Sequence, residues 1–136
     1  SDVYKRQRQK KYDPRIMCIE WIDPYFSAGH WVPEQIELAG FNSAIGQTGD
    51  QSRILSADEI VDSDPYAIAL ICCGYNLEQN LTFSSQLFHD DRLNHLDPFK
   101  ENRVYSFDAD SYFSRPTTRI LEGSIQLRSQ ILGNQI

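Results

Sequence analysis

The 136-residue sequence contains little of what a disulfide-bonded or metal-bound fold requires. It has three cysteines: Cys72 and Cys73 are adjacent, and Cys18 stands in a separate apolar run. An odd number of cysteines with this spacing is a poor disulfide framework, and no C-x-x-C pair is present to hold zinc. We therefore expect buried free thiols and no metal centre.

Motifs of catalysis and membrane insertion are missing as well. The sequence contains no G-x-S-x-G nucleophile motif, no P-loop pattern and no G-x-G-x-x-G pattern. It has no apolar run of the roughly 18 residues that a membrane-spanning helix needs, and no signal peptide opens this chain. These absences favour a non-catalytic protein that does not insert into a membrane.

Positive charge is scarce beyond the first eleven residues. Residues 1–11 carry a net charge of +4, whereas the remaining residues carry −10. An acidic folded part disfavours nucleic acid as a partner. We interpret residues 1–14 as a linker or the end of an incoming helix, in part foreign sequence, and residues 15–136 as one domain.

Apolar runs without helical spacing alternate with segments of helical spacing, and this alternation is the main signal of the fold. Strands are predicted at 15–22, 66–73 and 103–108. Helices are predicted at 33–39, 57–62 and 77–88, within 93–102, and at 117–132, while residues 41–51 are predicted to form a loop. The order predicts an α/β domain: a three-layer, Rossmann-like lobe with a mostly parallel sheet flanked by helices on both faces.

Two local patterns support the helices. Ser56 and Glu59 stand three residues apart and form a capping box that begins the short helix at 57–62. The last helix, which Gly133 terminates, is expected to bury one broad apolar face. This face consists of Ile120, Leu121, Ile125, Leu127, Ile131 and Leu132.

Aromatic and polar residues gather just after the predicted strands. In an open parallel sheet, ligands bind outside the carboxyl ends of the strands, and flat rings with a few polar groups suit a large, partly apolar ligand. The expected ligand-binding residues are Glu20, Trp21, Asp23, Tyr25, Phe26, His30 and Trp31 after the first strand, Tyr75 after the second, and Tyr112, Phe113 and Arg115 after the third.

Some of these residues have a second interpretation. Glu20 ends an apolar strand, so it either contacts the ligand or pairs with Arg115 or Arg119. His30 is either a hydrogen-bonded loop histidine or a ligand to a metal inside a bound cofactor. The segment from Asn80 to Thr82 fits a glycosylation acceptor formally, although chance explains it better.

Three blocks of sequence resemble a known family. They are RIMCIEWIDPYFSAGHWVPEQIELAG (15–40), SADEIVDSDPYAIALICCGY (56–75) and RVYSFDADSYFSRPTTR (103–119). Together they resemble the C-terminal half of cobalamin-binding proteins in the iron-siderophore and cobalamin group of periplasmic-binding proteins. The resemblance implies two α/β lobes joined by a long helix, with the ligand in the cleft between them. This chain would be the C-terminal lobe, and residues 5–11 the tail of the joining helix.

The resemblance implies cobalamin or a related corrinoid as ligand, no intrinsic cofactor, and delivery to an ABC permease in a periplasmic or extracytoplasmic compartment. Asp58 or Glu59 would dock onto permease arginines, unless both merely favour the helix N-terminus. Ser52 departs from the pattern, since it falls where a better-studied cobalamin binder has a ligand-stacking tryptophan.

Two alternatives stay open at this point. One is a ferric siderophore or haem as the ligand, bound by the same lobe. The other is a cytoplasmic corrinoid-handling protein or enzyme that reuses the fold, with Glu20, His30 and Cys73 in its site. Three unpaired cysteines favour a reducing compartment, which is the argument for the second alternative.

Overall fold

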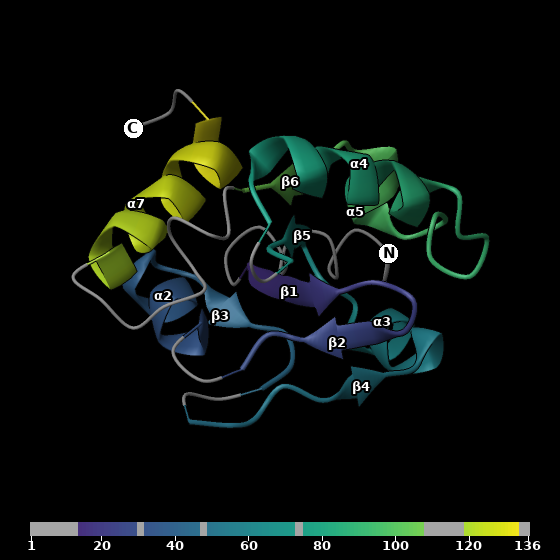
Figure 1. The fold of residues 1–136 in the computed structure, drawn as a ribbon, viewed down its shortest axis with the longest axis horizontal. Coiled ribbons are helices and arrows are strands. Elements are labelled where there is room, and N and C mark those ends of the chain that lie inside the picture. The colour runs from purple at the N-terminus through teal and green to yellow at the C-terminus, as the bar shows by residue number, and fades with distance from the viewer. Residues whose placement is uncertain (1–13, 30–31, 47–48, 73–74, 108–118, 134–136) are drawn as a thin grey trace, which may run out of the picture.

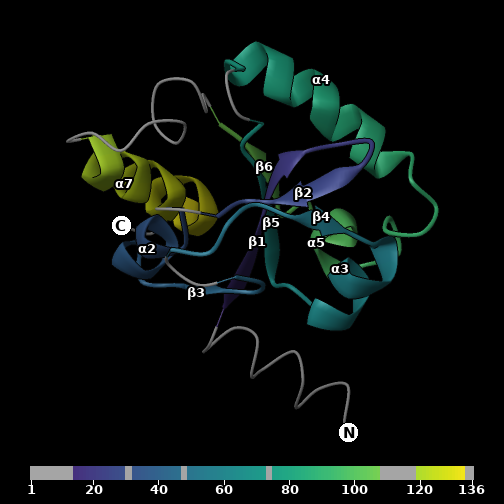
Figure 2. The same cartoon turned by 60° about the horizontal axis from the view of Figure 1, so that its bottom comes forward.

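A six-stranded sheet forms the middle layer of the molecule, with helices on both of its faces (Figures 1 and 2). The computed structural model describes residues 14–29, 32–46, 49–72, 75–107 and 119–133. The predicted fold class, an α/β lobe with a sheet flanked by helices, is confirmed. Among the described residues, no helix is long and apolar enough to cross a membrane.

Parallel pairing dominates the centre of the sheet. The strands are β1 (Arg15–Trp21), β2 (Tyr25–Ser27), β3 (Asn42–Ser43), β4 (Ile54–Leu55), β5 (Ala67–Leu70) and β6 (Val104–Ser106). Their order is β4-β2-β1-β5-β6, and β3 pairs with the start of β1. The pairs β1–β5, β5–β6 and β1–β3 are parallel, whereas β2 is antiparallel to β1 and to β4.

The three predicted strands are present as β1, β5 and β6, but β2, β3 and β4 were not predicted. Each has only two or three residues, which is too short for an alternating pattern. The prediction of a continuous loop at 41–51 is wrong at β3. Backbone bonds there, from Asn42 N to Pro14 O and from Ala44 N to Ile16 O, draw the segment alongside β1.

All the predicted helices form. They are α2 (Val32–Leu38), α3 (Ala57–Ser63), α4 (Leu77–Phe88), α5 (Asp97–Lys100) and α7 (Arg119–Leu132). The end of α2 is a Schellman motif, because Gly40 N donates to Glu37 O and Phe41 N donates to Ile36 O. Gly40 adopts a φ of +92°, which glycine tolerates without strain.

Side chains of the central strands alternate between two cores. Ile16, Cys18, Ala67 and Ala69 face α2 and α7. Their neighbours along the same strands face the opposite layer, which α3, α4 and α5 form (Figure 2). These neighbours are Met17, Ile19, Ile68 and Leu70. Both faces of the sheet are therefore buried, as the continuous apolar runs of a parallel sheet require.

The apolar face predicted for α7 is partly wrong. Ile125 is 59% exposed, whereas Ser124, Leu127 and Ile131 are buried. Positions 124, 127 and 131 share one side of a helix, and position 125 lies about 100° around the axis from position 124. Among the described residues of α7, the packed face therefore includes a serine, and Ile125 is turned away from it. Leu132 packs against the same core, and the side chains of Ile120 and Leu121 lie outside the described residues.

Candidate functional site

The carboxyl ends of β1, β5 and β6 lie at one edge of the sheet, because these strands run parallel with Ile19 opposite Leu70 and Leu70 opposite Ser106. The residues predicted to meet at this edge therefore include Trp21, at the end of β1, and Tyr75, which follows β5. His30 and Trp31 lie outside the described residues, as do Tyr112, Phe113 and Arg115.

Trp21 and Tyr75 form an aromatic cluster with Phe83 of α4. The ring centroids are 5.3 Å apart for Trp21–Tyr75, 5.8 Å for Trp21–Phe83 and 5.1 Å for Tyr75–Phe83, the last pair edge to face. All three rings are half-buried. Phe83 was not predicted to belong to the site, although its helix begins just after β5.

Glu20 lies in β1 at a break in the pairing with β2, between Ile19 opposite Ser27 and Trp21 opposite Phe26. Its carboxylate accepts a hydrogen bond of 2.6 Å from Ser52 Oγ. The alternatives proposed for it, Arg115 and Arg119, have side chains outside the described part of the chain. Ser52, the residue that departs from the family pattern, is thus the partner that the structure gives to Glu20.

Gly29, which follows β2, allows the segment that carries Ser52 to approach the backbone closely. A Cβ atom at Gly29 would lie 2.4 Å from Asp50 O and 2.7 Å from Ser52 N, well inside contact distance. The neighbouring Ser27 N donates to Arg53 O at 2.9 Å, which joins the two segments directly. A side chain at position 29 would therefore push Ser52 away from Glu20.

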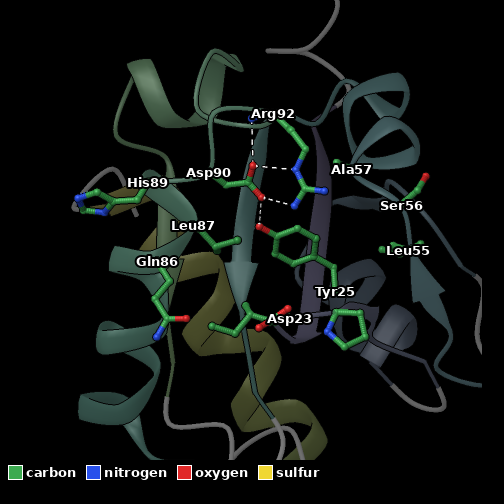
Figure 3. A pocket seen from close by; sticks show the side chains of 12 residues that line it. Asp23, Tyr25, Leu55, Ser56, Ala57, Gln86, Leu87, His89, Asp90 and Arg92 are labelled. Carbon is green, nitrogen blue, oxygen red and sulfur yellow. Dashed lines mark hydrogen bonds and ion pairs between the residues drawn. The ribbon is translucent and has the colours of Figure 1, made fainter.

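Asp23 and Tyr25 lie together at a different place, a pocket of about 460 Å³ between α3 and the end of α4 (Figure 3). Asp23 has a φ of +55° in the tight connection between β1 and β2. The pocket is lined by apolar Ile22, Leu55 and Leu87 and by polar Gln86 and His89. Phe26 pairs with Trp21 across the β1–β2 connection and is half-buried.

One wall of the pocket is a hydrogen-bonded network. Tyr25 Oη donates to Asp90 Oδ2, and Arg92 donates from Nε to Asp90 Oδ1 at 3.0 Å and from Nη2 to Oδ2 at 2.8 Å (Figure 3). The bonds from Arg92 are the largest cause that lowers the pKa of Asp90 to about 2. Burial and then the bond to Asp90 raise the pKa of Tyr25.

The two acids predicted to dock onto a permease differ in their surroundings. Glu59 completes the predicted capping box with Ser56 and forms an ion pair of 2.7 Å with Arg53. That pairing with Arg53 is the first cause that lowers the pKa of Glu59. Asp58 is exposed in the same turn of α3. The Glu59 side chain also reaches solvent, with 41% exposed, so the two acids differ in the partners that engage Glu59.

The described cysteines are structural. Cys18 and Cys72 are buried free thiols, as predicted, and Cys73 lies outside the described residues. Burial raises the pKa of Cys18 to about 12, so its thiol stays protonated and unreactive at neutral pH. Among the described residues, no three histidine, cysteine or acidic side chains gather as a metal site would require.

Asn80 is no glycosylation acceptor in the folded chain. Its side chain is fully buried, and its Oδ1 accepts a 2.7 Å hydrogen bond from Cys72 N. The formal match at residues 80–82 is therefore a chance match, as expected.

The chain matches known proteins over most of its length. The family described as periplasmic binding protein matches residues 2–111. No curated protein sequence gives a significant match. Among solved structures, an ABC transporter substrate-binding protein from Listeria monocytogenes is similar at 19% identity and a TM-score of 0.77, over 98% of this chain and 53% of that one.

Two further structures resemble the chain, one of a vitamin B12 binding protein and one of a protein complexed with heme. BtuF of Vibrio cholerae, the periplasmic vitamin B12 binding protein, has 16% identity and a TM-score of 0.67, over 96% of this chain and 51% of its own. IsdE of S. aureus, complexed with heme, has 16% identity and a TM-score of 0.71, over 93% and 50%. The chain spans about half the length of these structures. With the family match covering most of its residues, the chain belongs to the periplasmic binding protein family.

Proposed function

We propose that this chain is the C-terminal, non-catalytic lobe of a substrate-binding protein for ABC-type uptake, and that its ligand is cobalamin or a related corrinoid. The observation that carries the proposal is the cluster of Trp21, Tyr75 and Phe83 at the carboxyl edge of the sheet. Half-buried rings at this edge suit the flat, partly apolar face of a macrocycle.

Charge and polarity favour a corrinoid over haem. Residues 12–136 carry a net charge of −10, which repels a ligand with ionised carboxylates, such as haem with its two propionates. A corrin instead carries neutral amide side chains. The Glu20 carboxylate can accept hydrogen bonds from such amides, while Ser52 Oγ holds it in place.

The second candidate ligand is haem or a ferric siderophore. The haem complex of the similar IsdE structure is the specific observation in its favour. Both candidates are large metal chelates, so the lobe would use the same edge for either. They differ in charge and in the number of neutral amides, which a direct comparison of binding detects.

A ligand comparison by equilibrium dialysis tests the proposal. Because one lobe offers half a cleft, we expect cyanocobalamin to bind this chain with a dissociation constant of about 10 μM to 1 mM, which corresponds to about 4 to 7 kcal/mol. Haemin and ferrichrome should bind more weakly. Tighter binding of haemin than of cyanocobalamin would overturn the corrinoid assignment.

A pair of variants ties that binding to the aromatic cluster. Trp21→Ala removes a ring from the strand-tip edge and should weaken cyanocobalamin binding by about tenfold, or about 1.4 kcal/mol. Leu38→Ala is the matched control, because Leu38 is an exposed apolar residue that lies away from the ligand-binding edge. It ends α2, and the chain after α2 pairs with the start of β1, at the opposite edge of the sheet. Equal affinity of the two variants would place the ligand elsewhere.

We also propose Asp58 as the permease-docking acid of this lobe, in an extracytoplasmic compartment. Both acids reach solvent, but Glu59 is engaged by Arg53 and by the capping box, whereas Asp58 is exposed in the same turn of α3. In the two-lobe parent protein, Asp58→Asn should weaken binding to permease reconstituted in vesicles, and the loss should shrink at high salt. Asp62→Asn, at an exposed position later in α3, is the control.

A further inference from the structure

The turn that carries Tyr75 is closed by a backbone bond from Tyr75 N to Cys72 O at 3.1 Å, and one buried amide side chain, that of Asn80 in α4, bonds to its backbone as well. Asn80 is fully buried in a core that is otherwise almost entirely apolar. Its Oδ1 accepts from Cys72 N at 2.7 Å, and its Nδ2 donates to Tyr75 O at 3.2 Å and to Asn76 O at 3.0 Å. The side chain thus bonds to the backbone on both sides of the turn.

These bonds replace a sheet partner at the point where β5 stops. Ile71 N still donates to Ile19 O across the strand pair, but the next amide, Cys72 N, is buried and turns to Asn80 instead. A buried N–H without a partner costs about 1–3 kcal/mol. The bond to Asn80 Oδ1 avoids this cost for Cys72 N at the point where the chain leaves the sheet.

Asn80 also connects the turn to the neighbouring strand. Ser106 Oγ, at the end of β6, donates to the main-chain carbonyl of Asn80 at 3.2 Å. Asn76 caps α4 by a reciprocal pair of bonds with Gln79, which fixes the residue after Tyr75. The ends of β5 and β6 and the start of α4 are therefore joined around one residue.

We infer that Asn80 is a positioning residue for the ligand-binding edge: it holds the backbone of Tyr75 so that the Tyr75 ring packs against Trp21 and Phe83. Only the effect of Asn80 on ligand binding rests on the proposed function. The geometry itself, a buried amide that sets the position of an aromatic ring, can be tested without any ligand. Asn80 is thus a determinant of the site that itself contacts no ligand.

The test is Asn80→Asp in the full chain, read by nuclear Overhauser contacts between aromatic rings. The substituted carboxylate still accepts from Cys72 N but faces the carbonyls of Tyr75 and Asn76 with oxygen, so the turn should move. We expect the Trp21–Tyr75 ring contact to be lost. The Phe88–Phe99 contact, whose centroids are 5.0 Å apart in the same core, should persist.

A matched control is Asn94→Asp, since Asn94 Nδ2 also donates to a backbone carbonyl, that of Phe88, but outside the turn. It should leave the Trp21–Tyr75 contact intact. If Asn80→Asp fails to fold, Asn80→Ala serves the same test, because it removes the three bonds without adding charge. Persistence of the Trp21–Tyr75 contact in a folded Asn80 variant would overturn the inference, as would joint loss of both ring contacts.

Cyanocobalamin binding then separates this inference from the proposed function. If wild type binds, Asn80→Asp should raise the dissociation constant by about tenfold, whereas Asn94→Asp should change it by less than about twofold. If wild type does not bind but Asn80→Asp still loses the Trp21–Tyr75 contact, the corrinoid proposal fails and the positioning role stands.

Discussion

At the scale of single residues, the network of Tyr25, Asp90 and Arg92 shows which contacts a sequence conceals. Tyr25 stands out in the sequence because it follows a predicted strand. Asp90 and Arg92 lie 65 or more positions away in a polar stretch without periodicity. Only the fold brings the three together, so the predicted ligand-binding tyrosine has a partner that no local pattern indicates.

The acid dependence of stability should report this network. The pKa of Asp90 is lowered to about 2, so its ionised form stabilises the folded state above the ordinary aspartate range. That contribution is lost as pH falls from about 4 towards 2. Asp90→Asn should therefore cost about 1 kcal/mol in urea unfolding at pH 7, and its difference from wild type should shrink between pH 4 and pH 2.

The neighbouring aspartate provides the control for that titration. Asp91 is exposed next to Asp90. Asp91→Asn should stay within about 0.5 kcal/mol of wild type at both pH values. If the free energy of unfolding of Asp90→Asn stayed below that of wild type by the same amount from pH 7 to pH 2, the loss would arise from altered packing and not from the carboxylate.

At the scale of elements, patterns confined to a few neighbouring residues were predicted and pairings across the chain were not. The capping box of α3 depends on residues three apart, and the structure contains it in full. The short strand β4 pairs only with β2, and β2 pairs with β1, so neither short strand is visible in its own sequence. The pocket beside them was hidden for the same reason.

The capping box predicts a measurable loss for Ser56→Ala. Ser56 Oγ accepts from Glu59 N at 3.1 Å, and removal of an N-cap of this kind costs about 1 kcal/mol. Chemical denaturation should therefore give a lower free energy of unfolding with an unchanged dependence on urea. Ser85→Ala, in an exposed position inside α4, should be neutral or slightly stabilising because alanine favours helix. A lower free energy of unfolding in both variants would contradict the capping explanation.

At the scale of the whole molecule, one sheet packs against two cores. The alternating order of strands and helices predicted this arrangement. The burial of both faces followed from continuous apolar runs at 15–22 and 66–73. The exact faces of the helices did not follow, as Ile125 and Ser124 demonstrate. The rotation of α7 about its own axis depends on the shape of the sheet against which it packs. The spacing of apolar residues in α7 carries no information about that shape.

The shared sheet predicts cooperative unfolding. Leu70 belongs to the core under α3, α4 and α5, and Leu127 to the core under α2 and α7; both are fully buried. Leu70→Ala and Leu127→Ala should each lower the free energy of unfolding by about 2–5 kcal/mol in a single transition. Ile54→Ala, at an exposed site, should cost far less. Two separate transitions, one per core, would show that the layers fold independently.

The central claim is that the carboxyl edge of the sheet binds a corrinoid through Trp21 and Tyr75. A titration of the isotopically labelled chain with cyanocobalamin, followed by NMR to about 2 mM ligand, tests it most directly. The account predicts saturable shifts that are largest for the indole of Trp21 and the amide of Tyr75, with little change at the end of α2. No shift at any concentration in the folded chain, or shifts concentrated away from that edge, would contradict it.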